Sequence, residues 1–300
     1  MPCYSPINAG FDVNGKMTFS PKKHDEEYAS FKIPCGRCVG CRLDRSRDWA
    51  VRCVHEAQIH DKSCFITLTY RNSKISLTDD GVPTLNHYDF QLFMKRLRKE
   101  FGDGIGFFMA GEYGGDTSRP HYHALLFGVD FDDKQYLKKN ENGDNIYVSD
   151  QLDSLWGLND PDVMRCEIGA VSFESAAYVA RYVMKKLYGE MASLYDGRVP
   201  DYCKSSRKYA IGKRWLEKYW TDVFNVGSVV LKSGAKVAIP RYYVKWLEKN
   251  HYDAWLKHRF RDKSFMLSDE FQKDNTRERL RVKSIVKKAE IKTLRRSFDG

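Results

Sequence analysis

The sequence predicts an α+β fold in which helices pack on one face of a single antiparallel sheet. Segments rich in β-branched and aromatic residues alternate with amphipathic segments in the order strand, helix, strand, strand, strand, helix. That order suits one sheet under one layer of helices. Of the 300 residues, 42% are hydrophobic and 14% are aromatic, and the length suits either one large domain or one domain plus an appendage.

The predicted sheet begins with a central strand at residues 64–70, which is β-branched and aromatic. Asn86 then caps a helix that runs to about residue 100. The next two strands, residues 105–113 and 119–128, form a hairpin around the turn Gly114-Gly115-Asp116.

The rest of the predicted core follows a polar segment. Residues 130–165 are acidic and polar, and they are interpreted as an insertion. A strand at residues 167–171 then leads to Ser172, which caps a helix over residues 174–187.

We expect the whole chain to contain four regions. They are an N-terminal cysteine-rich segment with a basic helix, the core, an extension of the core and a basic helical tail, at residues 1–60, 61–190, 191–240 and 241–300. Residues 1–34 show no sustained period and are expected to be irregular. Three further elements are predicted, namely a helix at 41–60, a helix at 213–223 and a hairpin at 229–239.

Two histidines on one predicted strand form the first candidate site. His121 and His123 alternate with Tyr122, so they point to the same side, about 6–7 Å apart. Two imidazoles at that separation can hold one metal ion, and Glu112 on the neighbouring strand adds a carboxylate. Two nitrogens and one carboxylate suit Mg²⁺ or Mn²⁺. The alternative is that both histidines have only a structural role.

Two tyrosines on the predicted helix supply nucleophiles. Tyr178 and Tyr182 are four residues apart, and Lys185 follows on the same face. A phenol with a pKa of about 10 is rarely ionised at neutral pH, so attack on a phosphodiester needs a nearby cation. Two adjacent nucleophiles permit two successive transfers. The alternative is a packed helix face without chemistry.

A cysteine cluster near the N-terminus predicts a structural zinc site. Cys35, Cys38 and Cys41 follow a Cys-x-x-Cys-x-x-Cys spacing on a glycine-rich turn. A tetrahedral zinc needs four ligands, and Cys3 is the candidate for the fourth, with Cys53 as the alternative. Reduced thiols without metal are the other interpretation.

The charge of the chain favours a polyanionic partner. The net charge is +10, and residues 241–300 alone hold 17 lysines and arginines against 9 acidic residues, a difference of +8. This tail is interpreted either as a DNA-contacting arm or as a solvated helix. Neither an apolar run long enough to span a membrane nor a secretory signal is visible, so a cytoplasmic location is expected.

These motifs together resemble those of the HUH endonucleases, which initiate rolling-circle replication. The matching segments are Phe65-Ile66-Thr67-Leu68-Thr69-Tyr70, Arg119-Pro120-His121-Tyr122-His123 and Tyr178-Val179-Ala180-Arg181-Tyr182-Val183-Met184-Lys185-Lys186. The chain is most similar to the replication initiators of gokushoviruses, single-stranded DNA phages of the Microviridae. The segment Pro34-Cys35-Gly36-Arg37-Cys38-Val39-Gly40-Cys41-Arg42 is typical of that group.

The resemblance implies an RRM-like core and a nicking and joining activity on DNA. One tyrosine would become joined to a 5′ phosphate at the viral origin, and the second would cut the regenerated origin and close the circle. The implied partners are single-stranded and supercoiled double-stranded origin DNA, together with a host helicase and replisome. Arg119, Arg181 and Lys186 are the candidate nucleic-acid contacts.

Two other function classes stay open at this point. One is a non-catalytic, zinc-containing nucleic-acid-binding protein with structural histidines. The other is a relaxase or transposase in which only one tyrosine of the pair reacts.

Overall fold

The structure is a computed structural model that describes residues 3–20, 30–114, 117–140, 142–158, 165–185, 195–208 and 210–293. For residues 182–185 and 292–293 only the backbone is described. The chain divides into two compact units. The larger comprises residues 46–255, and the smaller comprises residues 1–45 and 256–295, as far as they are described. The four regions predicted from the sequence stay a prediction.

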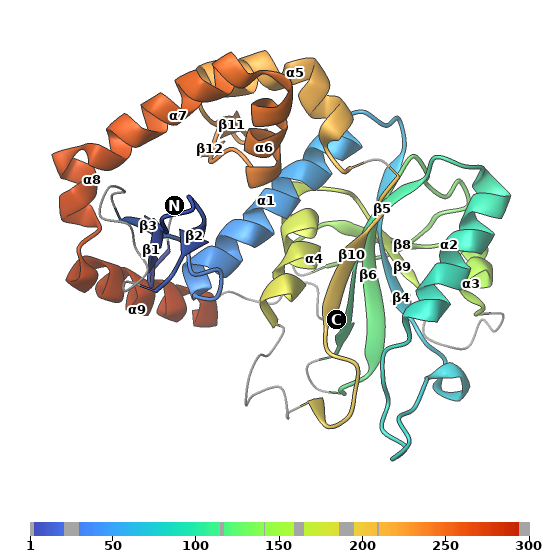
Figure 1. The fold of residues 1–300 in the computed structure, drawn as a ribbon. Coiled ribbons are helices and arrows are strands. Elements are labelled where there is room, and N and C mark those ends of the chain that lie inside the picture. The colour runs from blue at the N-terminus through green and yellow to red at the C-terminus, as the bar shows by residue number, and fades with distance from the viewer. Residues whose placement is uncertain are drawn as a thin grey trace. The chain divides into compact units, whose positions relative to one another are not determined.

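A seven-stranded antiparallel sheet forms the centre of the larger unit (Figure 1), with the strand order β10-β5-β6-β4-β9-β8-β7. Its strands are β4 (Ser63–Thr69), β5 (Gly106–Tyr113), β6 (Pro120–Phe127), β7 (Gln135–Lys139), β8 (Asn145–Val148), β9 (Glu167–Gly169) and β10 (Tyr202–Ser205). The helices nearest to it are α1 (Val39–Ala57), α2 (His87–Phe101), α3 (Asp150–Trp156) and α4 (Phe173–Lys185). A short 3-10 turn, η2 (Asn72–Lys74), follows β4. The predicted α+β class is confirmed, and every predicted strand and helix of the core is present, but β7, β8 and α3 lie between β6 and β9 in addition.

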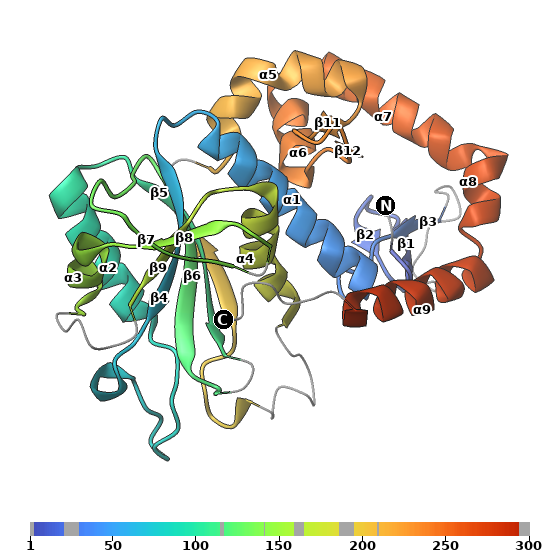
Figure 2. The ribbon, with the colours of Figure 1, turned by 180° about the vertical axis from the view of Figure 1, so that it is seen from behind.

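Helices cover both faces of this sheet, so the prediction of a single covered face was wrong (Figures 1 and 2). On one face α2 packs its Phe90, Phe93 and Leu97 against the sheet. On the other face α4 and α1 contribute Val179 and Ala50 to a second apolar cluster. The reason is visible in β4, whose neighbouring side chains are buried on both sides of the strand.

The polar segment after β6 extends the sheet instead of forming a separate insertion. Strand β7 pairs with β8, and β8 pairs with β9. All five residues of β7 are exposed. An edge strand of this kind is held by backbone hydrogen bonds to one neighbour, so its side chains show no apolar period that a sequence pattern could detect.

A helical layer completes the larger unit beyond the sheet. It contains α5 (Lys213–Val226), α6 (Arg241–Asn250) and the hairpin of β11 (Val229–Val230) and β12 (Lys236–Val237). Leu216 of α5 and Leu247 of α6 are buried together with Val51 of α1. The predicted hairpin is confirmed, and Gly234 in its turn has φ +83°, a conformation that glycine adopts without strain.

The smaller unit holds a three-stranded antiparallel sheet. Its strands are β1 (Ile7–Phe11), β2 (Met17–Thr18) and β3 (Phe31–Ile33), in the order β2-β1-β3. The expectation of irregular structure at residues 1–34 was therefore wrong. Strands this short contain too few residues for an alternation of apolar and polar side chains to be recognised in the sequence. The unit also contains α8 (Asp269–Asp274) and α9 (Arg277–Thr293), and α7 (Tyr252–Leu267) leads into it. Among the described helices, none has the length and apolar character needed to cross a membrane.

Candidate active site

Two antiparallel strands bring the predicted metal ligands to one place on the sheet. In the register of β5 and β6, Glu112 pairs with His121 and Ala110 pairs with His123. Paired residues in an antiparallel ladder project to the same face, so the carboxylate and both imidazoles share one face. Ala110 belongs to the apolar cluster of α4, which shows that this is the face α4 covers.

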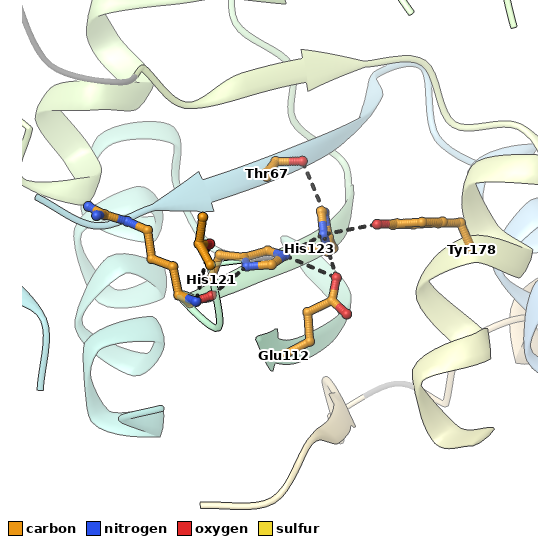
Figure 3. A network of polar contacts seen from close by, with 7 residues as sticks. Thr67, Glu112, His121, His123 and Tyr178 are labelled. Carbon is orange, nitrogen blue, oxygen red and sulfur yellow. Dashed lines mark hydrogen bonds and ion pairs between the residues drawn. The ribbon is translucent and has the colours of Figure 1, made fainter. Parts of the chain in front are cut away.

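The three side chains converge on one point (Figure 3). His121 Nε2 and His123 Nε2 each lie 3.0 Å from Glu112 Oε1, and the two nitrogens lie 3.1 Å apart. Glu112 is 1% exposed and His123 is 2% exposed, whereas the side chain of His121 keeps 15% exposure. Two imidazole nitrogens and one carboxylate oxygen, open on the side of His121, can hold a divalent metal ion.

Both histidines are oriented through their second ring nitrogen. His121 Nδ1 lies 3.1 Å from the carbonyl oxygen of Arg119, and since a carbonyl only accepts, Nδ1 carries the proton. His123 Nδ1 lies 3.0 Å from the hydroxyl oxygen of Thr67 on β4. Without a metal ion, protonated imidazoles donate from Nε2 to Glu112. A metal ion binds only the neutral imidazole, so Nε2 would lose its proton on metal binding while Nδ1 keeps its own.

Thr67 is a site residue that the sequence analysis did not assign. Its position follows from the register, because Thr67 pairs with His123 across β4 and β6. The signal available in the sequence was the alternation Thr67-Leu68-Thr69, which places both threonines on the face opposite to Leu68. Which threonine meets which histidine depends on the register, and the register is not readable from one strand alone.

We expect Thr67→Val to weaken Mn²⁺ binding by about tenfold or more, because the imidazole of His123 loses the partner that fixes its orientation. Metal titration of the purified protein would measure the change. Thr69→Val is the matched control, since the Thr69 hydroxyl on the same strand is buried and makes no hydrogen bond among the described residues. Equal losses in both variants, or none in Thr67→Val, would contradict the role given to Thr67.

The residue between the histidines anchors their strand from the opposite face. Tyr122 is fully buried, and its hydroxyl donates to the carbonyl oxygen of Asn86 at 2.7 Å and accepts from the Asn86 amide at 3.0 Å. Its ring lies over Gly111, where a Cβ would come within 2.9 Å of the ring. Strand β6 is thereby tied to the start of α2, which fixes the direction in which the histidines project.

Helix α4 begins at a reciprocal cap. The Ser175 amide donates to Ser172 Oγ at 3.1 Å, and the Ser172 amide donates to Ser175 Oγ at 2.8 Å. These bonds satisfy backbone donors that a helix start otherwise leaves unpaired, as in a capping box. The cap predicted at Ser172 is confirmed, and it fixes where the tyrosines of the helix lie along the sheet.

The hydroxyl of Tyr178 reaches the metal-ligand cluster from α4 (Figure 3). Its oxygen lies 3.3 Å from His123 Nε2, and its ring stands edge-on to that imidazole with the ring centroids 5.0 Å apart. Phe65 stacks on His123 and packs edge-on against Tyr178. The Arg181 guanidinium lies 5.6 Å from the Tyr178 ring centroid, which puts positive charge beside the phenol.

The Glu112 carboxyl group is held in its ionised form. Burial raises the pKa of this group, but hydrogen bonds and positive charge from His121 and His123 outweigh burial and lower the pKa of Glu112 well below its usual value. An ionised carboxylate between two imidazoles is the state in which such a site binds a cation.

The other predicted site residues fall into two groups. Arg119 is half-buried, and its guanidinium donates to the carbonyl oxygen of Tyr70 and to the side chain of Asn72. The backbone of Tyr182 and Lys185 continues helix α4, and their side chains are outside the described part of the structure, as is the whole of Lys186.

The four predicted cysteine ligands come together in the smaller unit. The sulfur atoms of Cys3, Cys35, Cys38 and Cys41 all lie within 4.8 Å of one another. Cys3 Sγ and Cys38 Sγ are 4.0 Å apart, close to the roughly 3.8 Å that tetrahedral zinc–sulfur bonds require. The alternative ligand, Cys53, is fully buried in the apolar cluster of α4 and α1 and is not among the four.

Backbone amides point at these sulfur atoms. The amides of Cys35, Cys38 and Tyr4 donate to sulfur at 3.2 to 3.3 Å. Burial raises the pKa of Cys38, but amide donors outweigh burial and lower that pKa to about 7. Four convergent sulfurs with amide donors are the chemistry of a structural zinc site, so the residues present fit the predicted ion.

The fold and the site together define a class of protein. An antiparallel sheet that presents two histidines and a carboxylate to a tyrosine-bearing helix is what the resemblance to rolling-circle replication initiators predicts. The sequence model of the family "Replication-associated protein ORF2/G2P" matches residues 63–187, the segment that carries this site. The chain belongs to the family of phage replication-associated proteins.

Three curated relatives support this membership. The chain is 38% identical to replication-associated protein VP4 of Bdellovibrio phage phiMH2K, over 86% of this chain and 81% of the relative. It is 30% identical to replication-associated protein ORF2 of Spiroplasma virus 4, over 74% and 69%. It is 30% identical to replication-associated protein ORF4 of Chlamydia phage 1, over 80% of this chain and 57% of the relative. No solved structure matches the chain.

Proposed function

We propose that this protein initiates rolling-circle replication of a phage genome by nicking one DNA strand at the viral origin and later rejoining it. The observation that supports the proposal most directly is the position of Tyr178, whose hydroxyl lies 3.3 Å from a metal-ligand nitrogen of His123. A nucleophile in that place is adjacent to any phosphate that the site binds. The partners are the single-stranded and supercoiled forms of the origin, with a host helicase and replisome, in the host cytoplasm.

Each site residue has its own role in the proposed nicking step. Glu112, His121 and His123 would hold Mg²⁺ or Mn²⁺, and such an ion polarises a bound phosphate and neutralises charge on it. Tyr178 loses its proton and its oxygen forms a bond to phosphorus, while the bond from phosphorus to the 3′ oxygen breaks and that oxygen takes up a proton. The product is a 5′-phosphotyrosine and a free 3′ hydroxyl.

Rejoining reverses these bonds. A 3′ hydroxyl attacks the phosphotyrosine, the phosphodiester forms again and the tyrosine is released, so no external energy source is needed. Tyr182 lies four residues further along α4 and supplies the second nucleophile. Lys185, Lys186 and Arg181 supply positive charge for the phosphate and the phenolate, and Arg119 holds the end of β4 in place.

A covalent-adduct assay tests this proposal. A labelled single-stranded origin oligonucleotide is incubated with the protein and Mn²⁺ and run on a denaturing gel. We expect a protein–DNA band that falls at least about a thousandfold in the double variant Tyr178→Phe/Tyr182→Phe, because both nucleophiles are lost. Each single variant should still form the band on some substrate.

Tyr136→Phe serves as the matched control, since Tyr136 is an exposed tyrosine on β7. If the wild-type protein bound the oligonucleotide but formed no adduct with any divalent ion, the non-catalytic zinc-containing binding protein would replace this proposal. If only one tyrosine ever formed the adduct, the enzyme would be of the one-tyrosine type.

A further inference from the structure

The net charge of the chain is concentrated in its smaller unit. Residues 1–45 and 256–295 contain 20 lysines and arginines against 11 acidic residues, whereas the rest of the chain contains 30 against 29. The smaller unit therefore carries +9 of the net +10, and the unit with the Glu112 site is almost neutral. A strong attraction for a polyanion belongs to the smaller unit.

One face of α9 presents this charge. Arg277, Arg281 and Lys288 fall within about 40° of one another around the helix and span about 16 Å along it. All three are exposed, and no ion pair of theirs is found among the described residues. By contrast Arg279, Lys283 and Lys287 of the same helix pair with Asp274 or Glu290. The backbone places Lys292 at the same face, one turn beyond Lys288.

A neighbouring face of α9, about 60–100° around the helix from the basic face, attaches the helix to its unit. Leu280 is buried with 6% exposure. Lys287 interacts electrostatically with Tyr4, whose neighbour Cys3 belongs to the cysteine cluster. The helix is thus held on one side while the basic face stays open to solvent.

We propose that this face of α9 binds the phosphate backbone of duplex DNA, as an anchor separate from the cutting site. The proposal deepens the proposed function, since it names the part of the chain that would hold the double-stranded form. A row of unpaired cations on a straight helix is complementary to regularly spaced phosphates. Residues 277–293 contain no aromatic residue, so the stacking contacts that bind single strands are absent from this segment.

Exposed apolar residues lie beside the basic face of α9, so binding to a membrane surface is the alternative to DNA binding. Val282, Ile285 and Val286 are 50 to 60% exposed. Helices that bind at membrane surfaces insert Trp, Phe and Leu from their apolar side, and this side of α9 has only Val, Ile and Ala. The chemistry of α9 therefore favours a nucleic acid, and vesicle binding is an outcome of the test.

Salt-dependent duplex binding tests the anchor. The full-length protein, without divalent metal, is titrated against a short fluorescent duplex of arbitrary sequence over a range of KCl concentrations. For Arg277→Gln/Arg281→Gln/Lys288→Gln we expect at least about a tenfold loss of affinity, and the slope of log affinity against log salt should fall by about 3. Arg277→Lys/Arg281→Lys keeps the charge and should bind like the wild type.

The matched control removes the same charge from the larger unit. Lys232→Gln/Lys236→Gln/Lys245→Gln changes three exposed lysines and should keep the wild-type slope. The anchor is overturned if the α9 variant keeps the wild-type slope, if the control loses as much, or if the α9 variant loses binding to phosphatidylserine vesicles but not to duplex. This assay measures duplex binding and not cutting. A protein that binds duplex through α9 but forms no covalent adduct would therefore contradict the proposed function without contradicting the anchor.

Discussion

His123→Gln is expected to reduce metal-dependent adduct formation by at least about a thousandfold. His123 is the most connected residue of the site, because its Nε2 contacts Glu112, His121 and Tyr178. Glutamine fits the space but offers a weaker neutral ligand and cannot keep the Nδ1 contact to Thr67. In the proposed mechanism, the variant therefore loses both a metal ligand and the group against which the Tyr178 hydroxyl is placed.

Metal affinity separates this effect from a folding defect. Mn²⁺ titration followed by electron paramagnetic resonance should show at least about a hundredfold weaker binding in His123→Gln, and a similar loss in Glu112→Gln, which removes the buried charge. His87→Gln is the control, since His87 packs beside Phe90 on the opposite face of the sheet. Wild-type Mn²⁺ affinity in His123→Gln would rule out the metal role of this histidine.

Cys38→Ser/Cys41→Ser is expected to abolish the proposed zinc binding and to loosen the smaller unit as a whole. Zinc bound to such a site contributes about 10–16 kcal/mol of binding free energy, which becomes folding free energy when the site exists only in the folded state. Residues 1–45 and 256–295 form one unit, so the loss should reach α9 although it is far away in the sequence.

Amide hydrogen exchange measures this loss region by region. In the variant, protection should fall in β1 to β3 and in α9, while β4, β5 and β6 of the larger unit keep theirs. Metal analysis should show one zinc per wild-type chain and none per variant chain. Cys203→Ser is the control, because this thiol lies on β10 and donates to the carbonyl oxygen of Val179, a bond that serine can keep. A wild-type protein purified without zinc, or unchanged exchange in α9, would contradict the prediction.

Much of the site was predictable from local patterns. The alternation around Tyr122 put His121 and His123 on one face, and a strand repeats every two residues wherever it lies in a sheet. Helical spacing predicted one shared face for Tyr178 and Tyr182, and the cysteine spacing predicted three convergent sulfur atoms on one turn. In each case the residues lie within a few positions of one another in the sequence. The backbone geometry of a single strand, helix or turn therefore determines their relative positions.

Relations between distant segments were decided only by the tertiary structure. The register of β4 against β6 determines that Thr67, and not Thr69, meets His123. Long-range packing selects Cys3 over Cys53 as the fourth cysteine, and it joins the two ends of the chain in one unit. Such contacts form where the free energy gained by burial exceeds the entropy lost in closing long loops. Both contributions depend on the whole chain, so no short sequence pattern reveals them.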